Sequence, residues 1–372
     1  MARLVAVVAR GNHGFVDVLR RTWDAGDAVF PLDPRLPPPA AEAILAAVAP
    51  ALIVDPDGGS QARKGSRPVD DGDALVVATS GSSGTPKAVV LTHAAVRAAA
   101  VATSAALEVE PSRDRWLACL PLAHVGGLSV VTRALATATP LSLVAHFDAA
   151  AVEAEAARGA TLVSLVPTAL ARVDASAFRR VLVGGSAPPA PRPPNVVATY
   201  GMTETGGGIV HDGRPLPGVA VREVDGELQV RGPMLARCYR DGRDPRGVGG
   251  WLATGDVGSV DDGGMVRVAG RRGEVIVTGG EKVWPAPVEA VLDRHPGVAE
   301  VAVTGRPDPE WGALVVALVV PVDAVRPPTL GDLRTWAKAS LPAYAAPRAV
   351  VLVERLPRTA LGKLRRDQLG EP

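Results

Sequence analysis

The sequence reads Ala74-Leu-Val-Val-Ala78 and continues into Thr79-Ser80-Gly81-Ser82-Ser83-Gly84-Thr85-Pro86-Lys87. The apolar run is typical of a buried strand, and glycines after a strand let backbone N–H groups turn inward. Hydroxyls and a lysine add further donors, so the stretch predicts a loop that binds phosphate. It is not a Walker A loop, because Pro86 stands where that motif needs its second glycine. On this stretch alone, a flexible Gly/Ser surface loop is the alternative.

The pattern of apolar and polar residues changes twice along the chain, which divides it into three sections. Up to about residue 199, short runs rich in valine and leucine alternate with helical patterns. This alternation predicts a mostly parallel sheet covered on both faces. Strands are expected at 28–32, 51–54, 75–78, 116–120, 141–144, 161–165, 180–183 and 196–199. Helices are expected at 15–23, 40–48, 94–107 and 127–136, after Asp148 and after Pro167, with a polar glycine-rich loop at 58–72.

The second section of the chain predicts antiparallel β structure, and the third predicts a small α+β domain. Short strands separated by turns are expected at 219–221, 227–231, 257–260 and 265–269. Beyond about residue 270, we expect a helix at 285–293, strands at 298–304 and 313–321, a helix at 330–340 and a strand at 349–353. The predicted fold class is α/β, with a large N-terminal domain over 1–270, a hinge at 271–273 and a small C-terminal domain over 274–372.

Composition excludes several classes of protein. The formal net charge of the 372 residues is +1, whereas nucleic-acid binders usually carry a basic excess. The apolar run near the N-terminus is too short for a signal peptide, and the longest run elsewhere is too short for a membrane span. We therefore expect a soluble cytoplasmic protein. The two cysteines, Cys119 and Cys238, lack metal-ligand spacing, and Cys119 in its apolar run is expected to be a core residue.

Further motifs follow the glycine-rich loop in a fixed order. Tyr200-Gly-Met-Thr-Glu-Thr205 follows an expected strand, and Trp251-Leu-Ala-Thr-Gly-Asp256 follows a glycine-rich turn. Gly270-Arg-Arg-Gly-Glu274 leads into Thr278-Gly-Gly-Glu-Lys282, and Pro357-Arg-Thr-Ala-Leu-Gly-Lys363 stands near the end. The ordered set resembles the adenylate-forming superfamily of acyl-CoA synthetases, firefly luciferases and peptide-synthetase adenylation domains. The resemblance extends from about residue 25 to the end of the chain.

This resemblance implies a two-step ligase that uses ATP, Mg²⁺ and coenzyme A (CoA). A carboxylate attacks the α-phosphate of ATP and releases pyrophosphate. A thiol, usually that of CoA, then attacks the acyl-adenylate and releases AMP. The loop would hold the β- and γ-phosphates. The implied ATP-binding residues are Thr79, Ser80, Gly81, Ser82, Ser83, Gly84, Thr85, Lys87, Tyr200, Gly201, Asp256 and Arg271.

Individual roles follow from the same resemblance. Glu204 matches a metal-binding glutamate, which suits the preference of Mg²⁺ for hard oxygen ligands. Thr203 matches a contact to the α-phosphate, and Asp256 and Arg271 match contacts to the ribose. Lys363 matches the mobile lysine that joins the carboxylate to the α-phosphate. The structural alternatives are a turn residue for Asp256, a first-turn acid for Glu204 and a solvated basic tail for Lys363.

The second step implies a movement of the C-terminal domain. In the superfamily this domain swings about a hinge, which removes the lysine and brings a glycine-containing loop to the thiol tunnel. The hinge position often carries Asp or Lys, and here the matching residue is Gly273, which tolerates large backbone changes. Gly279 and Gly280 are the candidates for the tunnel face.

Three further stretches are Pro121–Leu128, Ser164–Thr168 and Gly184–Pro188. They match those that border the acyl pocket in the superfamily, and they look most like the o-succinylbenzoate–CoA ligases of menaquinone biosynthesis. Many relatives have a longer stretch before the phosphate loop, so the first part of the N-terminal domain is expected to be shortened. His124 is expected either to pair with a substrate carboxylate or to be structural. No basic residue stands out for a second carboxylate. The candidate acyl-binding residues are His124, Gly126, Ser164, Thr168, Gly184, Gly185, Ser186 and Thr205.

Other functions are compatible with the same motifs. Another aryl- or short-acyl-CoA ligase would use the same mechanism, and a stand-alone adenylation enzyme would load a carrier-protein thiol. A nucleotide-binding regulator without chemistry is disfavoured by the terminal Lys363, which mere binding does not need. Dependence of AMP release on CoA separates the CoA ligases from the carrier-loading enzyme. The superfamily resemblance also makes a homodimer an expectation.

Overall fold

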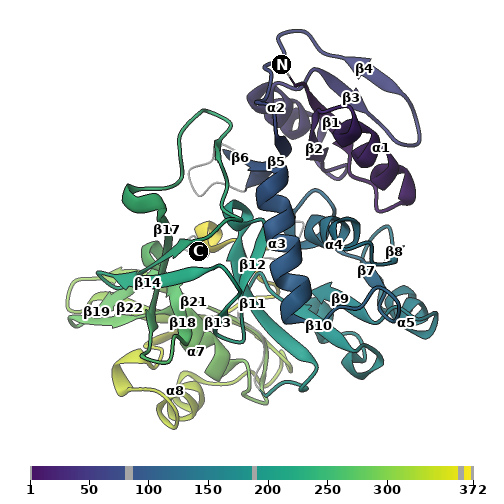
Figure 1. Ribbon diagram of the computed structural model, residues 1–372. Helices are drawn as coiled ribbons and strands as arrows, with labels where there is room; N and C mark the ends of the chain where they lie inside the picture. The colour runs from purple at the N-terminus through teal and green to yellow at the C-terminus, as the bar shows by residue number, and fades with distance from the viewer. Residues whose placement is uncertain (1, 80–86, 187–190, 359–363, 370–372) are drawn as a thin grey trace. The chain divides into compact units, whose positions relative to one another are not determined.

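The computed structural model describes residues 2–79, 87–186, 191–358 and 364–369 (Figure 1). The chain forms two compact units. The first consists of residues 1–221 and 230–253, and the second of residues 222–229 and 254–372. Among the described residues, no helix has the length and apolar content needed to cross a bilayer.

Two seven-stranded sheets form the centre of the first unit. The first sheet has the order β16-β6-β5-β2-β1-β3-β4. β1 pairs in parallel with β2 and β3, and β2 pairs in parallel with β5. The β5–β6, β6–β16 and β3–β4 pairs are antiparallel. The strands are β1 (Leu4–Val8), β2 (Ala28–Leu32), β3 (Leu52–Val54), β4 (Ser60–Ala62), β5 (Asp73–Thr79), β6 (Lys87–Thr92) and β16 (Cys238–Tyr239).

The second sheet has the order β13-β12-β11-β10-β9-β7-β8. Its central pairs β11–β10, β10–β9, β9–β7 and β7–β8 are parallel. The β11–β12 and β12–β13 pairs at one edge are antiparallel. The strands are β7 (Trp116–Ala118), β8 (Leu141–Leu143), β9 (Leu162–Leu165), β10 (Arg180–Val183), β11 (Val196–Met202), β12 (Gly207–His211) and β13 (Arg214–Pro215).

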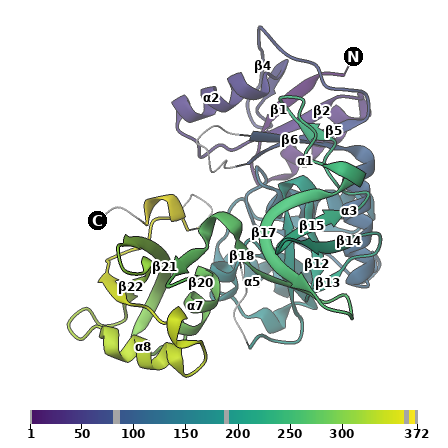
Figure 2. The same ribbon diagram turned by 90° about the vertical axis from the view of Figure 1, so that its left-hand side faces the viewer.

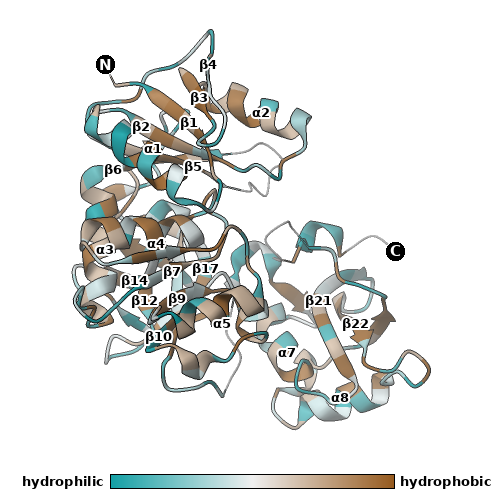
Figure 3. Ribbon diagram, turned by 90° about the vertical axis from the view of Figure 1, so that its right-hand side faces the viewer, coloured by the Kyte–Doolittle hydropathy of each residue, from teal (hydrophilic) through white to brown (hydrophobic). Residues whose placement is uncertain are grey.

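Helices cover the faces of these sheets because the strands are apolar on both sides. Successive residues of a strand point to opposite faces, so Leu75 joins one buried cluster and Val76 another. Phe15 of α1 packs in the first cluster and Ile44 of α2 in the second. Figure 3 shows the same apolar character along β1 and β3. The helices are α1 (His13–Asp24), α2 (Pro38–Val48), α3 (His93–Ala106), α4 (Val125–Ala136), α5 (Ala149–Ala157) and α6 (Pro167–Leu170).

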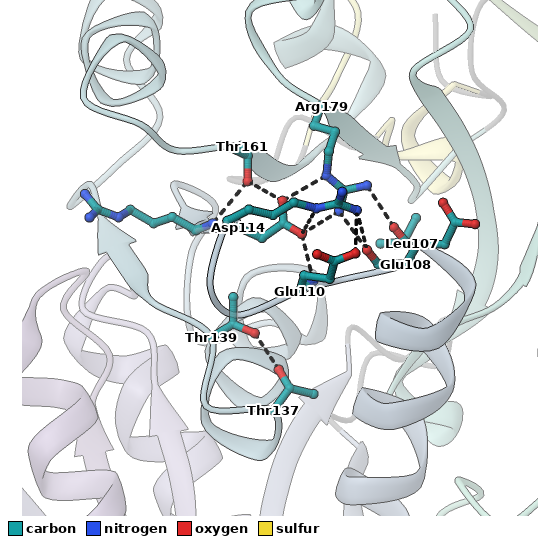
Figure 4. Close-up of polar contacts among 10 residues, drawn as sticks. Leu107, Glu108, Glu110, Asp114, Thr137, Thr139, Thr161 and Arg179 are labelled. Carbon is teal, nitrogen blue, oxygen red and sulfur yellow. Dashed lines mark hydrogen bonds and ion pairs between the residues drawn. The ribbon is translucent and has the colours of Figure 1, made fainter.

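A buried ion pair ties the end of α3 to the second sheet (Figure 4). The Asp114 carboxylate accepts two hydrogen bonds from the Arg179 guanidinium, at 2.7 and 2.8 Å. It also accepts hydrogen bonds from the Thr161 hydroxyl and the backbone N–H of Glu110. Arg179 donates in addition to the backbone oxygen of Leu107. Both partners are well satisfied by protein groups, so this cluster is structural.

Sheets of the second unit are smaller. Most residues of a four-stranded sheet, ordered β14-β15-β17-β18, belong to this unit. The other sheet has the order β20-β19-β22-β21, with β23 beside β22. The strands are β14 (Ala220–Val224), β15 (Glu227–Arg231), β17 (Leu252–Val260), β18 (Val266–Arg271), β19 (Ile276–Thr278), β20 (Glu281–Val283), β21 (Val298–Asp308), β22 (Gly312–Pro321) and β23 (Ala349–Leu352).

Two helices, α7 (Pro285–Leu292) and α8 (Leu330–Lys338), cover one face of the β21–β22 pair (Figure 2). Val288 of α7 and Leu333 of α8 share a buried cluster with Val303 of β21. The opposite face packs against the C-terminal tail, through residues such as Leu369. The strands are therefore buried on both sides, as their near-continuous apolar sequence requires.

The predicted fold class is confirmed, and several details of the expected strands are wrong. The strands do not form one mostly parallel sheet but two sheets with parallel centres and antiparallel edges. The glycine-rich loop does not lead directly into a helix, because β6 intervenes. The expected loop at 58–72 contains β4, and the apolar N-terminal run forms β1. β1 is stabilised by the sequence-distant β2 and β3, whereas β4 and β6 pair with the strands just before them, β3 and β5. Strand pairing of either kind is not revealed by local periodicity.

Candidate functional site

The glycine-rich loop connects the two strands of an antiparallel hairpin. Thr79 at the end of β5 lies opposite Lys87 at the start of β6, and the Thr79 hydroxyl donates to the Lys87 backbone oxygen at 3.3 Å. The expected phosphate-binding residues between them lie outside the described residues: Ser80, Gly81, Ser82, Ser83, Gly84 and Thr85. The structure thus places the two ends of the loop side by side.

Tyr239 lies beside Lys87, on the strand that pairs with β6. The Lys87 ammonium nitrogen is 5.9 Å from the centroid of the Tyr239 ring. The Tyr239 hydroxyl donates a 3.0 Å hydrogen bond to Oε1 of Glu204. Burial, and then the nearby Glu204 carboxylate, raise the pKa of Tyr239, so its hydroxyl stays protonated. One tyrosine therefore contacts both a predicted phosphate-binding residue and the predicted metal-binding residue.

Glu204 is presented by a tight turn after β11. The turn is a single 3₁₀ turn, Thr203–Thr205, and the fully buried Thr205 hydroxyl donates to the backbone oxygens of Met202 and Gly207. Thr205 was expected to bind the acyl group, but its hydroxyl is used by the turn itself. Gly201 precedes the turn, where an added Cβ would lie 2.0 Å from the Gly207 oxygen. Only glycine fits at this close approach of two strands.

The expected acyl-binding stretches gather at the carboxyl ends of β9 and β10. Because these strands are parallel neighbours, Ser164 and Thr168 are brought to the same edge as Gly184, Gly185 and Ser186. A side chain at Gly184 would require Thr199 to shift, since an added Cβ would lie 2.6 Å from the Thr199 hydroxyl oxygen. A ligand site at this edge is the usual arrangement for a parallel sheet.

His124 has a protein partner. It stands just before α4, and its Nε2 lies 3.5 Å from a carboxylate oxygen of Asp33, after β2. Burial opposes ionisation of Asp33, but hydrogen bonds from Arg35 and His124 outweigh it and lower the Asp33 pKa. The contact suits the structural role considered for His124. Gly126 follows in the first turn of α4, where a Cβ would meet only the Leu120 side chain, at 3.8 Å.

Arg133 on α4 was not identified from the sequence, and its surroundings are unusual. Its side chain is 5% exposed, and its guanidinium carbon lies 4.4 Å from the centroid of the Trp116 ring. It donates a 2.8 Å hydrogen bond to Ser164 Oγ, while its Nε has no partner among the described residues. Burial lowers its pKa to about 9, which leaves it charged at neutral pH. Within the described parts of the chain, no carboxylate pairs with it.

Two adjoining hollows lie beside this arginine. One is lined by Thr103, Arg133 and the glycines 206–208, among others. The other is mainly aliphatic, with Leu75, Val77, Leu91, Val96, Val125 and Leu128 in its wall. Ser129, Thr132 and Gly206 line both. Each hollow has room for little more than one water molecule, so together they mark where the Arg133 side chain meets an apolar wall and do not form a pocket for a ligand.

The second unit holds the predicted ribose contacts. Asp256 on β17 lies opposite Arg271 on β18, and their side chains form a 2.9 Å ion pair. Asp256 is buried within a strand, which excludes the alternative that it is only a turn residue. Arg271 also donates to the backbone oxygen of Thr254 at 2.9 Å. The structure therefore brings these two residues together.

The other predicted site residues in the second part of the chain are Gly273, Gly279, Gly280 and Lys363. Gly273 lies in a short 3₁₀ turn after β18, with no atom within 4 Å of where a Cβ would be. Gly279 and Gly280 form the β19–β20 turn, with φ of +58° and +83°, which favour glycine. Lys363 lies outside the described residues.

Comparison with known proteins identifies the family. Residues 58–240 match the AMP-binding enzyme family model, and residues 287–363 match the AMP-binding enzyme C-terminal domain. A probable 2-succinylbenzoate–CoA ligase of Mycobacterium tuberculosis is 39% identical over 362 residues, covering 89% of this chain and 93% of the relative. The chain belongs to the AMP-binding enzyme family. This result confirms the superfamily expected from the sequence motifs.

Other members of the AMP-binding enzyme family agree in sequence and fold. A 2-succinylbenzoate–CoA ligase of Bacillus cereus is 35% identical over 339 residues, covering 80% of this chain and 69% of the relative. The o-succinylbenzoate CoA synthetase MenE of Bacillus subtilis, solved with its acyl-adenylate intermediate, has a TM-score of 0.81 at 27% identity, covering 100% of this chain and 88% of MenE. ATP-bound MatB of Rhodopseudomonas palustris, at 23% identity and a TM-score of 0.86, shares the fold.

Arg133 lies in none of the motifs on which the family was expected. It stands in Val130-Val-Thr-Arg-Ala-Leu135, an otherwise mostly apolar stretch of helix. A charge inside the apolar face of a helix is a sequence signal for a buried functional group, because an unpaired buried charge is costly. The position of Ser164 at the end of β9 then supplies its one polar side-chain partner among the described residues.

Proposed function

We propose that this protein is an ATP-dependent acid–thiol ligase that converts 2-succinylbenzoate to its acyl-adenylate and then to its CoA thioester. Membership of the AMP-binding enzyme family supports the adenylate chemistry. The names of the curated relatives and of MenE support the acid. The same resemblance gives the protein a place in menaquinone biosynthesis. Arg133 is the observation in this chain that carries the choice of acid.

Arg133 supplies the cation that a second carboxylate requires. 2-Succinylbenzoate has one carboxylate to activate, and its other carboxylate stays ionised while bound. A charge-assisted contact with Arg133, with Ser164 as a neighbouring hydroxyl, would compensate both the buried cation and the desolvated anion. Apolar side chains near it, such as Val125, would suit contact with the aromatic ring. Benzoate or a fatty acid would leave Arg133 unpaired.

The first half-reaction needs charge stabilisation around the departing pyrophosphate. Lys87 and the residues 79–85 would hold the β- and γ-phosphates, Thr203 the α-phosphate, and Asp256 and Arg271 the ribose. Tyr200 and Gly201 would border the nucleotide. Lys363 would join the carboxylate to the α-phosphate. Rotation of the C-terminal domain, 274–372, about the hinge at 271–273 would then remove Lys363 and bring Gly279 and Gly280 to the CoA tunnel.

A magnesium ion fits the carboxylate of Glu204. Oε1 accepts from Tyr239, and no partner of Oε2 is found among the described residues. The described residues contain no cluster of three acidic, histidine or cysteine ligands. Mg²⁺ is usually bound by one or two carboxylates together with substrate phosphates and water, so a single glutamate suffices. The ion would neutralise charge on the phosphates.

A homodimer and a cytoplasmic location stay predictions.

The test is AMP formation from ATP over a panel of acids, with and without CoA. The panel contains 2-succinylbenzoate, benzoate, anthranilate, a hydroxybenzoate and a short fatty acid. We expect turnover with 2-succinylbenzoate to exceed that with the monocarboxylates, and to depend on CoA. Turnover of another acid, with none of 2-succinylbenzoate, would keep the adenylate chemistry and reject the assigned substrate. AMP release that does not respond to CoA would instead indicate a carrier-protein thiol.

A further inference from the structure

Tyr239 is placed by strand pairing between the predicted phosphate-binding lysine and the predicted metal-binding glutamate. β16 is antiparallel to β6, and Tyr239 lies opposite Val89. Residues two apart on a strand share a face, so Lys87 is the diagonal neighbour of Tyr239 on that face. The 5.9 Å distance from the ammonium nitrogen to the ring centroid follows from this register. Such a contact is a cation–π interaction.

The Tyr239 hydroxyl reaches Glu204 from the other direction. Its oxygen is 3.0 Å from Glu204 Oε1, and the backbone N–H of Ala236 donates to the backbone oxygen of Glu204 at 2.7 Å. The segment that ends in β16 therefore holds both the backbone and one carboxylate oxygen of Glu204. Restriction of the side chain to one rotamer would direct the other oxygen, Oε2, to a single position.

The backbone on either side of Tyr239 is anchored. Arg240 donates from its backbone N–H to the Ala88 oxygen at 2.7 Å, and its guanidinium donates to the backbone oxygens of Val48 and Pro68. The guanidinium carbon of Arg243 lies 5.4 Å from the centroid of the Tyr239 ring. The ring is thus held by strand pairing and by two cations.

Lys87 and Glu204 carry opposite charges, and both contact the side chain of Tyr239. The described residues nevertheless show no ion pair between them. A direct ion pair would neutralise the ammonium that phosphate needs and the carboxylate that a metal needs. Tyr239 offers each of them a different partner, the ring face for Lys87 and the hydroxyl for Glu204. The two groups can therefore remain available to different parts of a nucleotide.

We propose that Tyr239 is a positioning residue that orients Glu204 toward the metal ion and keeps Lys87 from pairing with that carboxylate. The inference rests on the proposed function, because it assumes that the protein binds ATP with a divalent cation. It adds a residue that none of the sequence motifs identified. The hydroxyl and the ring have separable tasks, so two substitutions at one position distinguish them.

The test measures binding of Mn²⁺·ATP, in the absence of any acid, by the electron paramagnetic resonance signal of Mn²⁺. Tyr239→Phe removes the hydroxyl and keeps the ring, and we expect the dissociation constant to rise roughly tenfold, as for loss of one hydrogen bond to a charged group. Tyr239→Leu removes both contacts and should weaken binding further. Tyr344→Phe, at a partly exposed tyrosine of the second unit, is the matched control and should leave binding unchanged.

A double-mutant cycle tests the route of the effect. If Tyr239 acts through Glu204, Tyr239→Phe should have no further effect on Mn²⁺·ATP binding in a Glu204→Gln background. The same loss in both backgrounds would overturn the inference. Unchanged binding by folded Tyr239→Phe, beside a wild type that binds, would also overturn it and leave the proposed function standing. A wild-type protein that does not bind Mn²⁺·ATP would overturn both.

Discussion

Arg133 is buried and Arg179 is partly buried, and the two differ in what balances their charge. Arg179 pairs with Asp114 through two hydrogen bonds, as Figure 4 shows. Arg133 has a hydroxyl, Ser164 Oγ, and an aromatic ring as its neighbours among the described residues. A buried cation without an anion costs free energy, and an anionic substrate would recover it. The first arginine is therefore structural, and the second is expected to bind ligand.

Removal of Arg133 should change substrate choice more than folding. Charge-assisted hydrogen bonds contribute ~1.5–3 kcal/mol each, so Arg133→Leu should lower kcat/KM for 2-succinylbenzoate by roughly 10- to 100-fold. Benzoate lacks the second carboxylate, and its slow turnover should change little. Arg172→Leu is the matched control, since Arg172 lies over the Phe147 ring at the exposed surface. Equal losses for both acids would contradict a role in binding the second carboxylate.

His211, beside Arg133, gives the protein a predicted acid sensitivity. Burial, and then the charge of Arg133, lower the His211 pKa to about 4, although Asp212 opposes the shift. The unfolded chain, with an ordinary histidine pKa of 6.5, binds the proton more readily below neutral pH. Stability from the neutral imidazole is therefore complete above about pH 6.5 and is lost as the pH falls toward 4.

This titration is measurable by urea unfolding at pH 7 and pH 5. Because the two pKa values differ by about 2.5 units, His211 should account for about 2 kcal/mol of the stability lost between those pH values. His211→Gln should reduce the loss by that amount, whereas His13→Gln, at an exposed position, should not. An unchanged acid dependence in His211→Gln would show that the imidazole already takes up a proton in the folded protein at pH 5.

At the scale of elements, local sequence predicted helices and central strands better than edge strands. A helix was expected after Asp148, and the structure shows that the Asp148 side chain caps α5 by accepting from the Ala151 N–H. Strand β6 was missed, although Lys87–Thr92 is rich in valine, since β5 ends at Thr79 and β6 begins at Lys87, so the two-residue turn that signals a hairpin in a sequence is absent between them. Strand β16 has two residues and exists only through its pairing with β6.

An ion cluster in the second unit fixes the C-terminal tail. Arg366 lies 2.7 Å from Glu289 of α7 and 3.1 Å from Glu274, and it donates to the backbone oxygen of Val303. The cluster is partly buried, so loss of the arginine removes the cation that pairs with the Glu289 carboxylate. Arg366→Met should lower the free energy of unfolding by roughly 2–3 kcal/mol and speed proteolysis of the tail.

A surface pair provides the control for this prediction. Arg326 and Asp323 form an exposed ion pair at 3.3 Å. Exposed ion pairs usually contribute about 0–1 kcal/mol to the free energy of unfolding, and we expect the same of this one. Arg326→Met should therefore leave both stability and proteolysis almost unchanged. If the two variants behaved alike, the Arg366 cluster would be no more than a surface interaction, and the tail would be held by apolar contacts such as that of Leu369.

At the scale of the whole molecule, the order of motifs predicted the family. The residues proposed to bind the acid could be recognised only from the three-dimensional structure. The ATP-binding residues are recognisable because each stands in a characteristic short motif. Arg133 and Tyr239 belong to no such motif, and their roles arise from partners at least 30 residues away in sequence, Ser164 for Arg133 and Glu204 for Tyr239. Contacts of that kind depend on the fold and are not visible in local spacing.

The two half-reactions should be separable by one substitution each in the C-terminal part of the chain. Lys363→Ala should strongly slow adenylation, because the lysine would no longer stabilise the negative charge that develops on the α-phosphate. It should leave thioesterification of preformed acyl-adenylate largely intact. Gly280→Leu should do the reverse, since it would narrow the proposed thiol tunnel. At Gly280 a Cβ meets no atom within 4 Å, so the main cost is ~1 kcal/mol of backbone strain at φ +83°.

Acid-dependent pyrophosphate exchange measures the first half-reaction, and CoA-dependent AMP release from synthetic acyl-adenylate measures the second. A crossed result, in which each variant loses a different half-reaction, is the outcome expected if the C-terminal domain presents Lys363 in the first step and Gly280 in the second. Equal loss of both half-reactions in Lys363→Ala would contradict its assigned role. If Gly280→Leu impaired only pyrophosphate exchange, the β19–β20 turn would belong to the nucleotide site rather than to the thiol tunnel.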